Sequence, residues 1–303
     1  MLKLSIIGTS KIVEEHIKAA KAAGFELFSI ASTRKKSKNL KKILKKFKFK
    51  FSFDNWIDAV NHSNKFKNTS FLIAPRIQDT FKVLDLILKK KNFVFVEKPL
   101  TTKINQFNKL MVNNNKVFLG YNRIFYKNIV FLKKNINNIK SVIVKCPELN
   151  KKNILYNSVH VISVLLYLFG DLKILSKKKS KKNIFIHLIN KKNVPVYLFF
   201  NFNASENYSI NIYGNKKRFF LKPLETLSIF DGMAIKKNAL NKNLVEYMPK
   251  LKFKKNEMMF DNFKPGFLAQ MKAFKKFIQT KRNIKNNLIF GKKIMLLAKK
   301  ISA

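Results

Sequence analysis

Short apolar runs alternate with amphipathic stretches along the first 120 residues of the chain. Apolar runs bounded by turn residues predict strands, and apolar residues at helical spacing predict helices. Strands are expected over 4–7, 26–31, 51–53, 69–74, 93–96 and 117–119. Helices are expected over 12–23, 38–47, 80–90 and 104–113, with a short one around Trp56. Such alternation is typical of a parallel sheet covered by helices on both faces.

The pattern changes after Gly120. A strand over 141–145 and a helix over 157–169 are followed by strands over 184–189, 194–201, 208–213 and 218–221, and by helices over 266–279 and 288–301. The lysine-rich stretch 177–182 is expected to be a solvated turn. Consecutive strands with few helices between them favour an antiparallel sheet. We therefore predict an α/β chain with two domains: a Rossmann-type parallel sheet over 1–121, and an α+β domain over 122–303 built on an open, largely antiparallel sheet.

The composition indicates a folded protein with an unusual charge. Apolar residues make up 47% of the 303, which is enough for a core and excludes wholesale disorder. Lys and Arg number 63 against 16 Asp and Glu, a net charge of +47, yet only five basic residues are arginine. Specific DNA-binding proteins depend on arginine, and these lysines are scattered, as codons rich in A and T would produce. We expect no specific nucleic-acid partner, and a surface that attracts anionic small molecules.

The cysteine count and the hydropathy exclude further classes of protein. Cys146 is the sole cysteine, which rules out a disulfide framework and a cysteine-built zinc site. His16, His62 and His187 lack metal-ligand spacing, so no metal is expected and these three are expected to be structural. No segment approaches the ~20 apolar residues of a membrane span, and the start lacks a secretory leader. We expect a soluble, cytoplasmic protein without a membrane partner.

The turn after the first strand is the first candidate for a functional site. A dinucleotide site needs glycines that let backbone N–H groups approach a pyrophosphate at a helix N-terminus. The stretch Gly8-Thr9-Ser10-Lys11-Ile12-Val13 keeps only Gly8, with Ser10 and Val13 at the other two glycine positions. It is either an ordinary turn or a cofactor turn, and its place in the first βα unit favours the cofactor.

The end of the second strand bears on the choice of cofactor. An acidic residue there would bind the ribose 2′-hydroxyl of NAD. The chain has Ser32, Thr33 and Arg34 instead, and hydroxyls followed by a rare arginine fit a 2′-phosphate. This sequence favours NADP slightly over NAD.

A lysine follows the strand 93–96 in the sequence Glu97-Lys98-Pro99. Open α/β sheets bind ligands at the carboxyl ends of their strands. A lysine whose pKa is lowered by burial can give or take a proton there. The alternative is a surface lysine, which is the default in so lysine-rich a chain.

Seven stretches follow one another in an order and spacing that we recognise. They are the opening turn, Ile73-Ala74-Pro75, Val96-Glu97-Lys98-Pro99-Leu100, Gly120-Tyr121-Asn122-Arg123-Ile124-Phe125, Asn157-Ser158-Val159-His160-Val161-Ile162, Leu165-Leu166-Tyr167-Leu168-Phe169-Gly170 and Lys264-Pro265-Gly266-Phe267. Together they resemble the glucose–fructose oxidoreductase / inositol dehydrogenase (Gfo/Idh/MocA) family of NAD(P)-dependent sugar oxidoreductases. The resemblance spans nearly the whole chain, and the Glu-Lys-Pro is its most specific part.

The resemblance implies a catalytic pair. Lys98 would lie beside the nicotinamide and handle the proton of the reacting hydroxyl, and His160 would pair with it at the substrate. Glu97 and Pro99 would shape the turn, for which a cis Lys98–Pro99 bond is expected. Without the resemblance, a histidine followed by apolar residues is more often a core residue.

The resemblance also implies two sets of binding residues. Cofactor contacts are expected from Gly8, Thr9, Ser10, Lys11, Ile12, Ser32, Thr33, Arg34, Ala74, Pro75, Glu97, Lys98 and Arg123. Substrate contacts are expected from Lys98, Tyr121, Asn122, Tyr126, Asn157 and His160. For Arg123 an interdomain salt bridge is an equal alternative.

Two departures from the family's motifs leave a second interpretation open. The family often carries aspartates four residues before and three residues after the histidine, where this chain has Tyr156 and Ser163. A histidine without a carboxylate partner is a weaker base, and Ser10 weakens the glycine turn. The alternative is a degenerate member that binds nucleotide or a partner without catalysis.

The expected activity follows from these stretches together. We expect an NAD(P)-dependent dehydrogenase or reductase acting on CH–OH groups, which transfers a hydride to or from a secondary hydroxyl or ketone of a sugar, cyclitol or nucleotide sugar. The resemblance implies a homodimer or homotetramer formed through the open sheet. A third hypothesis, a nucleic-acid or anionic-membrane binder driven by charge, predicts a steep salt dependence and ranks last.

Overall fold

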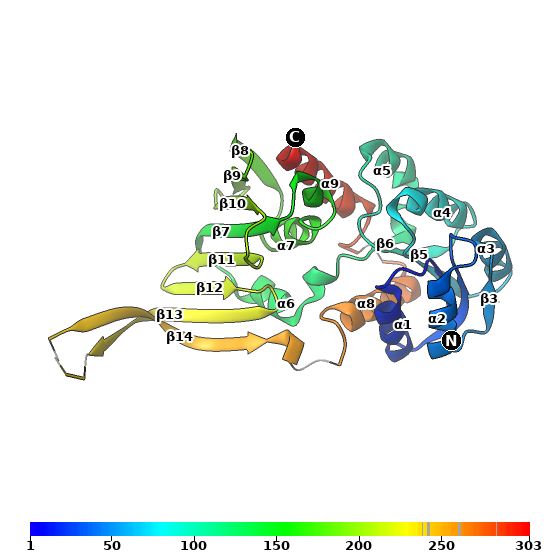
Figure 1. Cartoon of the computed structure of the whole chain (residues 1–303), viewed down its shortest axis with the longest axis horizontal. Coiled ribbons are helices and arrows are strands. Elements are labelled where there is room, and N and C mark those ends of the chain that lie inside the picture. The colour runs from blue at the N-terminus through cyan, green and yellow to red at the C-terminus, as the bar shows by residue number, and fades with distance from the viewer. Residues whose placement is uncertain (238, 241–242, 260–261, 283) are drawn as a thin grey trace. The chain divides into compact units, whose positions relative to one another are not determined.

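Two compact units make up the chain in the computed structural model, which describes residues 1–237, 239–240, 243–259, 262–282 and 284–303 (Figure 1). The first unit comprises Met1–Phe125 and Asn262–Lys300, and the second comprises Tyr126–Asp261 and Ile301–Ala303. Each unit is built on a sheet of its own.

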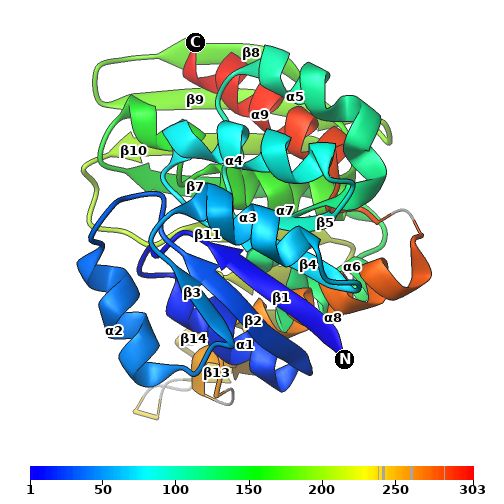
Figure 2. The ribbon, with the colours of Figure 1, turned by 90° about the vertical axis from the view of Figure 1, so that its right-hand side faces the viewer.

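A six-stranded parallel sheet forms the centre of the first unit. Its strands are β1 (Leu2–Ile7), β2 (Phe25–Ala31), β3 (Phe51–Phe53), β4 (Thr69–Ile73), β5 (Phe93–Val96) and β6 (Val117–Leu119). They lie in the order β3-β2-β1-β4-β5-β6, and every neighbouring pair is parallel. Figure 2 shows β1, β2 and β3 side by side. The predicted Rossmann-type sheet is confirmed, and its strand order reverses between β1 and β4, where such sheets bind ligands.

Helices pack against this sheet through their apolar faces. The connecting helices are α1 (Val13–Ala22), α2 (Lys38–Lys46), α3 (Trp56–Asn64), α4 (Ile77–Lys89) and α5 (Ile104–Leu110), with the 3₁₀ helices η1 (Met111–Lys116) and η2 (Asn122–Phe125) on either side of β6. In α2 the lysines are exposed, whereas Leu40 and Ile43 are buried. Ser37 caps this helix, because its hydroxyl accepts a hydrogen bond from the Leu40 N–H at 3.3 Å.

Helix α8 (Phe267–Thr280), near the end of the chain, belongs to the first unit. Its Phe274 lies in the same core cluster as Phe25 of β2, and the two rings stack with centroids 6.0 Å apart. Lys275 donates to the Ala23 carbonyl at 2.8 Å. The predicted division into 1–121 and 122–303 therefore differs from the observed grouping. Periodicity identifies an amphipathic helix but does not indicate which sheet receives its apolar face.

Helix α9 (Leu288–Ser302) also has most of its length in the first unit. A Cβ added to its Gly291 would lie 2.2 Å from Cδ1 of Leu119 in β6, so the absence of a side chain there permits the close packing. Just before the helix, the Asn286 amide donates to the Leu119 carbonyl at 3.0 Å.

An eight-stranded sheet forms the second unit. Its strands are β7 (Ile139–Glu148), β8 (Leu172–Lys179), β9 (Asn183–Asn190), β10 (Pro195–Phe202), β11 (Ser209–Gly214), β12 (Lys217–Leu221), β13 (Thr226–Lys237) and β14 (Val245–Asn256). They lie in the order β14-β13-β12-β11-β7-β10-β9-β8, and of these pairs β7–β10 is parallel and the others are antiparallel. The predicted open, largely antiparallel sheet is confirmed. Its helices are α6 (Lys127–Asn135), α7 (Val159–Phe169) and the 3₁₀ helices η3 (Lys151–Leu155) and η4 (Glu257–Met259).

Strand β8 corrects one prediction. The stretch 177–182 was expected to be a solvated turn, but residues 177–179 pair with β9 and only 180–182 form the turn. β8 is the edge strand of its sheet, and its lysines are largely exposed. Lysine on an edge strand blocks pairing with a further strand, and it also hides the alternation by which a strand is recognised in the sequence.

Strands β13 and β14 are absent from the sequence prediction. Only 227–231 of β13 pair with β12, and beyond this point β13 and β14 form a two-stranded ribbon that extends past the other strands of their sheet (Figure 1). Side chains on both faces of this ribbon are largely exposed. A strand with no buried face has no reason to alternate apolar and polar residues, so periodicity gives no signal.

Candidate cofactor and catalytic site

Gly8 brings the end of β1 against the end of β4. Its φ of +116° lies in the region open to glycine, and a Cβ there would lie 2.5 Å from the carbonyl carbon and oxygen of Ala74 and 2.6 Å from the nitrogen of Pro75. The Gly8 N–H donates to the Ala31 carbonyl at 2.8 Å, which ties the turn to the end of β2 as well. This position therefore requires glycine, and it collects three predicted cofactor residues at one edge of the sheet.

A cavity of about 150 Å³ lies at this edge. It is lined by Thr9, Ser10, Ser32, Thr33, Arg34, Ser37, Asn39, Ala74, Pro75 and Arg76. Seven of the thirteen predicted cofactor residues are among them, and the other six, Gly8, Lys11, Ile12, Glu97, Lys98 and Arg123, are not. Three lining residues, Ser37, Asn39 and Arg76, were not predicted from the sequence. The signal for Arg76 was available, because arginine is rare in this chain and two of its five arginines, Arg34 and Arg76, line this cavity.

Hydroxyl groups form one wall of the cavity. The Thr9 hydroxyl donates to Ser32 Oγ at 3.3 Å and lies 3.1 Å from Ser37 Oγ. Ser32 Oγ also accepts the Arg34 N–H at 3.1 Å, and the Asn39 amide donates to the Thr9 carbonyl at 3.0 Å. These bonds join the turn after β1 to the turn after β2, so two predicted sites far apart in sequence form a single site.

A wider hollow of about 580 Å³ adjoins the cavity at Ser32 and Thr33. Its remaining lining residues are Lys35, Lys36, Lys41, Asp54, Asn55 and Trp56. Trp56 is the single tryptophan of the chain, so its fluorescence reports on this part of the molecule alone.

The Glu97-Lys98-Pro99 turn lies at the same edge, after β5. The Glu97 N–H donates to the Ile73 carbonyl at 2.9 Å, which holds the start of the turn beside the end of β4. The Lys98–Pro99 bond is cis, as expected. The Lys98 side chain is half-buried. The predicted proton-handling lysine therefore lies where parallel sheets bind ligands.

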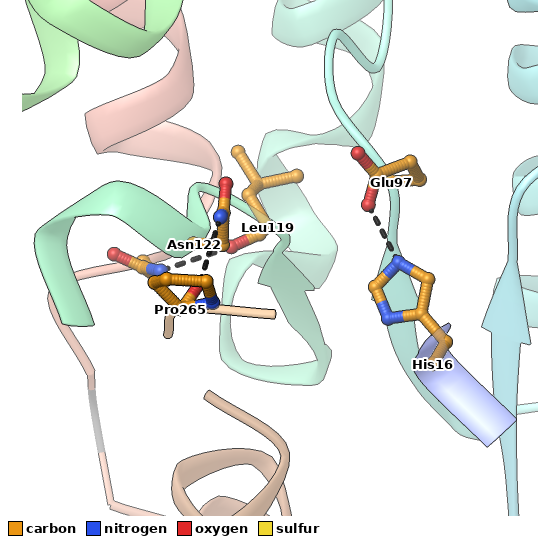
Figure 3. Close-up of polar contacts among 6 residues, drawn as sticks. His16, Glu97, Leu119, Asn122 and Pro265 are labelled. Carbon is orange, nitrogen blue, oxygen red and sulfur yellow. Dashed lines mark hydrogen bonds and ion pairs between the residues drawn. The ribbon is translucent and has the colours of Figure 1, made fainter. Parts of the chain in front are cut away.

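Glu97 meets a buried histidine on α1. His16 Nε2 lies 2.8 Å from Glu97 Oε2, and Figure 3 shows the imidazole turned toward the carboxylate. His16 is completely buried, whereas the Glu97 side chain is 18% exposed. The rings of Phe95 and Phe267 pack on the imidazole with centroids at 5.2 and 4.7 Å. The sequence analysis assigned His16 a structural role and missed this contact, because nothing local links residue 16 to residue 97.

Tyr121 and Asn122 are both buried within the first unit. Burial, and after it the charge of Glu97, raises the pKa of the Tyr121 hydroxyl. The Asn122 amide donates to the Pro265 carbonyl at 3.2 Å (Figure 3), which ties η2 to the loop before α8. As substrate contacts these two residues stay predictions.

His160 is the second residue of helix α7 in the second unit and is half-buried. The family often has aspartate at the positions of Tyr156 and Ser163, and neither of these residues provides a carboxylate for the His160 imidazole. Tyr156 is 41% exposed, and the Ser163 hydroxyl donates to the His160 backbone carbonyl at 2.6 Å. The structure therefore gives Ser163 a helix-internal bond instead of the role of the missing aspartate.

A buried carboxylate that the sequence analysis missed lies at the end of β7. Glu148 accepts hydrogen bonds from the hydroxyls of Ser158 and Tyr208, and from the Asn157 amide at 3.4 Å. Burial, and after it the bond to Glu148, raises the pKa of the Tyr208 hydroxyl. Glu148 thus orients Asn157, a predicted substrate contact that lies two residues before the start of α7 at Val159.

Tyr126, another predicted substrate contact, is buried in the second unit. Its hydroxyl donates to Glu225 Oε1 at 3.1 Å. Within the described residues no three His, Cys, Asp or Glu side chains are grouped to hold a metal ion. Across that same part of the chain, no helix has both the length and the apolarity to cross a membrane.

The fold and the cavity together define a class of protein. A parallel sheet in this strand order, with a hydroxyl- and arginine-lined cavity beside the β1/β4 reversal, is a nucleotide-binding Rossmann domain. Residues 2–117 match the family described as "Oxidoreductase family, NAD-binding Rossmann fold". Residues 2–117 therefore carry the NAD-binding Rossmann fold of the Gfo/Idh/MocA oxidoreductases, and the resemblance inferred from the sequence is confirmed over this stretch.

Solved structures share the fold across both units. The dehydrogenase MviM from Clostridium difficile is similar with a TM-score of 0.79 and 18% identity, over 99% of this chain and 98% of that one. The UDP-N-acetylglucosamine 3-dehydrogenase GnnA from Acidithiobacillus ferrooxidans is similar with a TM-score of 0.74 and 12% identity, over 99% of this chain and 96% of that one. KijD10, a 3-ketoreductase from Actinomadura kijaniata in complex with TDP-benzene and NADP, is similar with a TM-score of 0.73 and 14% identity, over 99% of this chain and 96% of that one. The comparison with curated proteins yields no match.

Proposed function

We propose that this oxidoreductase uses NADP to interconvert a secondary hydroxyl and a ketone on a sugar, cyclitol or nucleotide sugar. One observation carries the proposal. Seven residues predicted for the cofactor line one cavity at the carboxyl edge of the sheet, and the Lys98 turn lies at the end of β5 on that edge. The two halves of a dinucleotide bind along such an edge, on either side of the strand reversal.

The residues present fit this cofactor. Gly8 lets the turn after β1 lie against Ala74 and Pro75, so that Thr9 and Ser10 line the cavity where Rossmann domains hold the pyrophosphate, although Ser10 replaces the second glycine. Arg34 and Arg76 supply planar cationic groups suited to a 2′-phosphate. Among the described residues, none of those that line the cavity is acidic, whereas NAD-binding sites use a carboxylate for the ribose 2′-hydroxyl. The nearest carboxylates are those of Asp54, in the adjoining hollow, and of Asp79, which accepts from the Thr33 hydroxyl at 3.4 Å. These features support NADP over NAD.

The chemistry needs a hydride carrier and a group that moves a proton. The nicotinamide supplies or accepts the hydride when the cofactor is bound. In oxidation, the Lys98 amine takes the proton from the substrate hydroxyl while the carbon that bears this hydroxyl gives up its hydride to the cofactor. In reduction, Lys98 in its ammonium form gives that proton to the ketone oxygen. His160 assists at the substrate oxygen, and Glu148 orients the neighbouring Asn157.

Charge and structural likeness support an anionic substrate. The net charge of +47 favours diphosphate-bearing ligands at moderate salt. One of the similar structures is named a UDP-N-acetylglucosamine 3-dehydrogenase, and another is a complex with TDP-benzene and NADP. We therefore place nucleotide sugars first among the substrate classes.

The experiment is a substrate panel followed by absorbance of the reduced nicotinamide. Sugars, cyclitols and nucleotide sugars are offered with NADP and NAD, and their keto forms with NADPH and NADH. The proposal predicts turnover with one nucleotide sugar and a preference for the phosphorylated cofactor. The exposed Lys109→Ala variant is the matched control for Lys98→Ala, and it should keep the wild-type rate.

A second candidate is cofactor binding without catalysis. Ser10 in the glycine turn, and the lack of a carboxylate at Tyr156 and Ser163, favour it. It predicts quenching of Trp56 fluorescence by NADPH with no turnover of any substrate in the panel. Turnover of one substrate would exclude it.

A further inference from the structure

The contact between His16 and Glu97 lies outside every role assigned above. The imidazole has two nitrogens, and Nε2 is 2.8 Å from the Glu97 carboxylate. The other nitrogen, Nδ1, is buried and has no hydrogen-bond partner within the described residues. A positively charged imidazole would carry an N–H at this second position, buried and unsatisfied among aromatic rings, which is costly.

The hydrogen-bond geometry favours one tautomer of the His16 imidazole. The neutral tautomer with its proton on Nε2 donates to Glu97 and leaves only an acceptor lone pair buried at Nδ1. A neutral donor orients the carboxylate without cancelling its charge. This tautomer of His16 therefore fixes the position of the Glu97 carboxylate through a hydrogen bond.

The surroundings of Glu97 hold it in one place. Gly120 leaves room for it, because a Cβ there would lie 3.1 Å from Glu97 Oε2 and 2.9 Å from a ring carbon of Phe95. The charge of Glu97 contributes to the raised pKa of the buried Tyr121. The carboxylate therefore has a fixed position directly before Lys98, at the end of β5.

We infer that His16 is a positioning residue that holds the charged Glu97 carboxylate at the nicotinamide end of the cofactor site, and that this charge favours the oxidised over the reduced cofactor. The inference rests on the proposed function, because a Rossmann sheet places the nicotinamide half beyond the strand reversal, on the side of β4, β5 and β6. The oxidised ring is a cation and the reduced ring is neutral. A fixed anion at that end of the site would therefore stabilise the cationic oxidised form over the neutral reduced form.

Binding of the two cofactor forms tests the inference in the full-length chain. The dissociation constants of NADP⁺ and NADPH are measured by Trp56 fluorescence for wild type, Glu97→Gln, His16→Leu and His16→Gln. Glu97→Gln should weaken NADP⁺ relative to NADPH by about tenfold, which corresponds to about 1.4 kcal/mol. His16→Leu should shift the ratio in the same direction, whereas His16→Gln, whose amide can still donate, should restore most of it. His62→Gln, at a histidine in a separate aromatic cluster of the same unit, should leave the ratio unchanged.

Nitrogen NMR of the wild-type imidazoles provides a readout that needs no cofactor. It should show His16 as the neutral tautomer with its proton on Nε2, and an imidazolium or a proton on Nδ1 would overturn the inference. Cofactor that binds with the same NADP⁺ to NADPH ratio in His16→Leu or Glu97→Gln as in wild type would overturn it while leaving the proposed function intact. Wild type that binds neither form would overturn both.

Discussion

Gly8 allows the end of β1 to pack closely against the end of β4. In Gly8→Ala the new Cβ would meet backbone atoms 2.5 Å away, which cannot move as a side chain would. We expect a loss of more than about 2 kcal/mol in the free energy of unfolding, together with loss of NADPH binding. Urea denaturation and Trp56 fluorescence measure the two effects.

Gly170 is the matched control for this substitution. Its φ is also positive, +79°, but a Cβ there would have no atom within 4 Å. Gly170→Ala should therefore cost only the backbone strain of this conformation, about 1–3 kcal/mol, and should leave NADPH binding intact. Equal losses in the two variants would show that close approach at Gly8 is unimportant.

Arg34 and Arg76 should decide between the two nicotinamide cofactors. Replacing either with Gln removes a charged fork from the cavity, so NADPH should bind about tenfold more weakly while NADH changes little. Isothermal titration measures both affinities. Arg282→Gln, at an exposed arginine outside the cavity, serves as the control. A loss of affinity that is equal for NADH and NADPH would assign these arginines to a different phosphate or to the adenine.

What the sequence could predict at this scale depended on local context. Gly8, Ser32 and Lys98 stand at the ends of strands that the hydrophobic pattern identifies, so their common edge could be inferred before the structure was known. His16 and Glu148 could not be found in that way. Each acts through a contact with a residue that no local pattern links to it, 81 positions away for His16 and 60 for the bond between Glu148 and Tyr208.

At the scale of elements, α6 shows why a helix can escape prediction. Its first N–H groups, those of Lys127 and Asn128, donate at 2.9 and 2.6 Å to the carboxylate of Glu257, which comes from η4. A capping residue within the helix sequence would have marked this start, but the cap comes from 130 positions later. Strands β13 and β14 likewise lack an alternation of buried and exposed residues. Strands β2, β4, β5 and β6 are mostly buried on both faces, and this burial produces the continuous apolar runs from which they were predicted.

Glu257 also makes stability depend on pH. Burial raises its pKa above the ordinary 4.5, with smaller opposing effects from the two backbone N–H groups. Between 4.5 and the raised value the folded state holds more protons than the unfolded state, so the free energy of unfolding falls as pH rises through that window. Glu257→Gln should lack this fall. Urea denaturation at acidic and neutral pH measures the free energy of unfolding, and Glu246→Gln, at an exposed glutamate, is the control. Identical pH profiles for wild type and Glu257→Gln would contradict the expectation.

At the scale of the whole molecule, the C-terminal helices determine how the chain divides. Phe274 of α8 is fully buried in the core cluster of the first unit, 249 positions from Phe25 on which it stacks. Phe274→Ala should lower the free energy of unfolding by about 3–5 kcal/mol. Phe253→Ala, at a phenylalanine that is 42% exposed on β14, should cost much less. Similar costs for the two variants would mean that α8 does not complete this core.

The central claim is that the lysine after β5 moves the substrate proton. A single-turnover measurement of hydride transfer, with enzyme and NADP in excess over the nucleotide sugar identified by the panel, tests it most directly. We expect Lys98→Ala to lower the transfer rate by about a thousandfold, which is within the range for loss of a general acid–base, and to bind NADP as tightly as wild type. A Lys98→Ala enzyme that transfers hydride at the wild-type rate would contradict it.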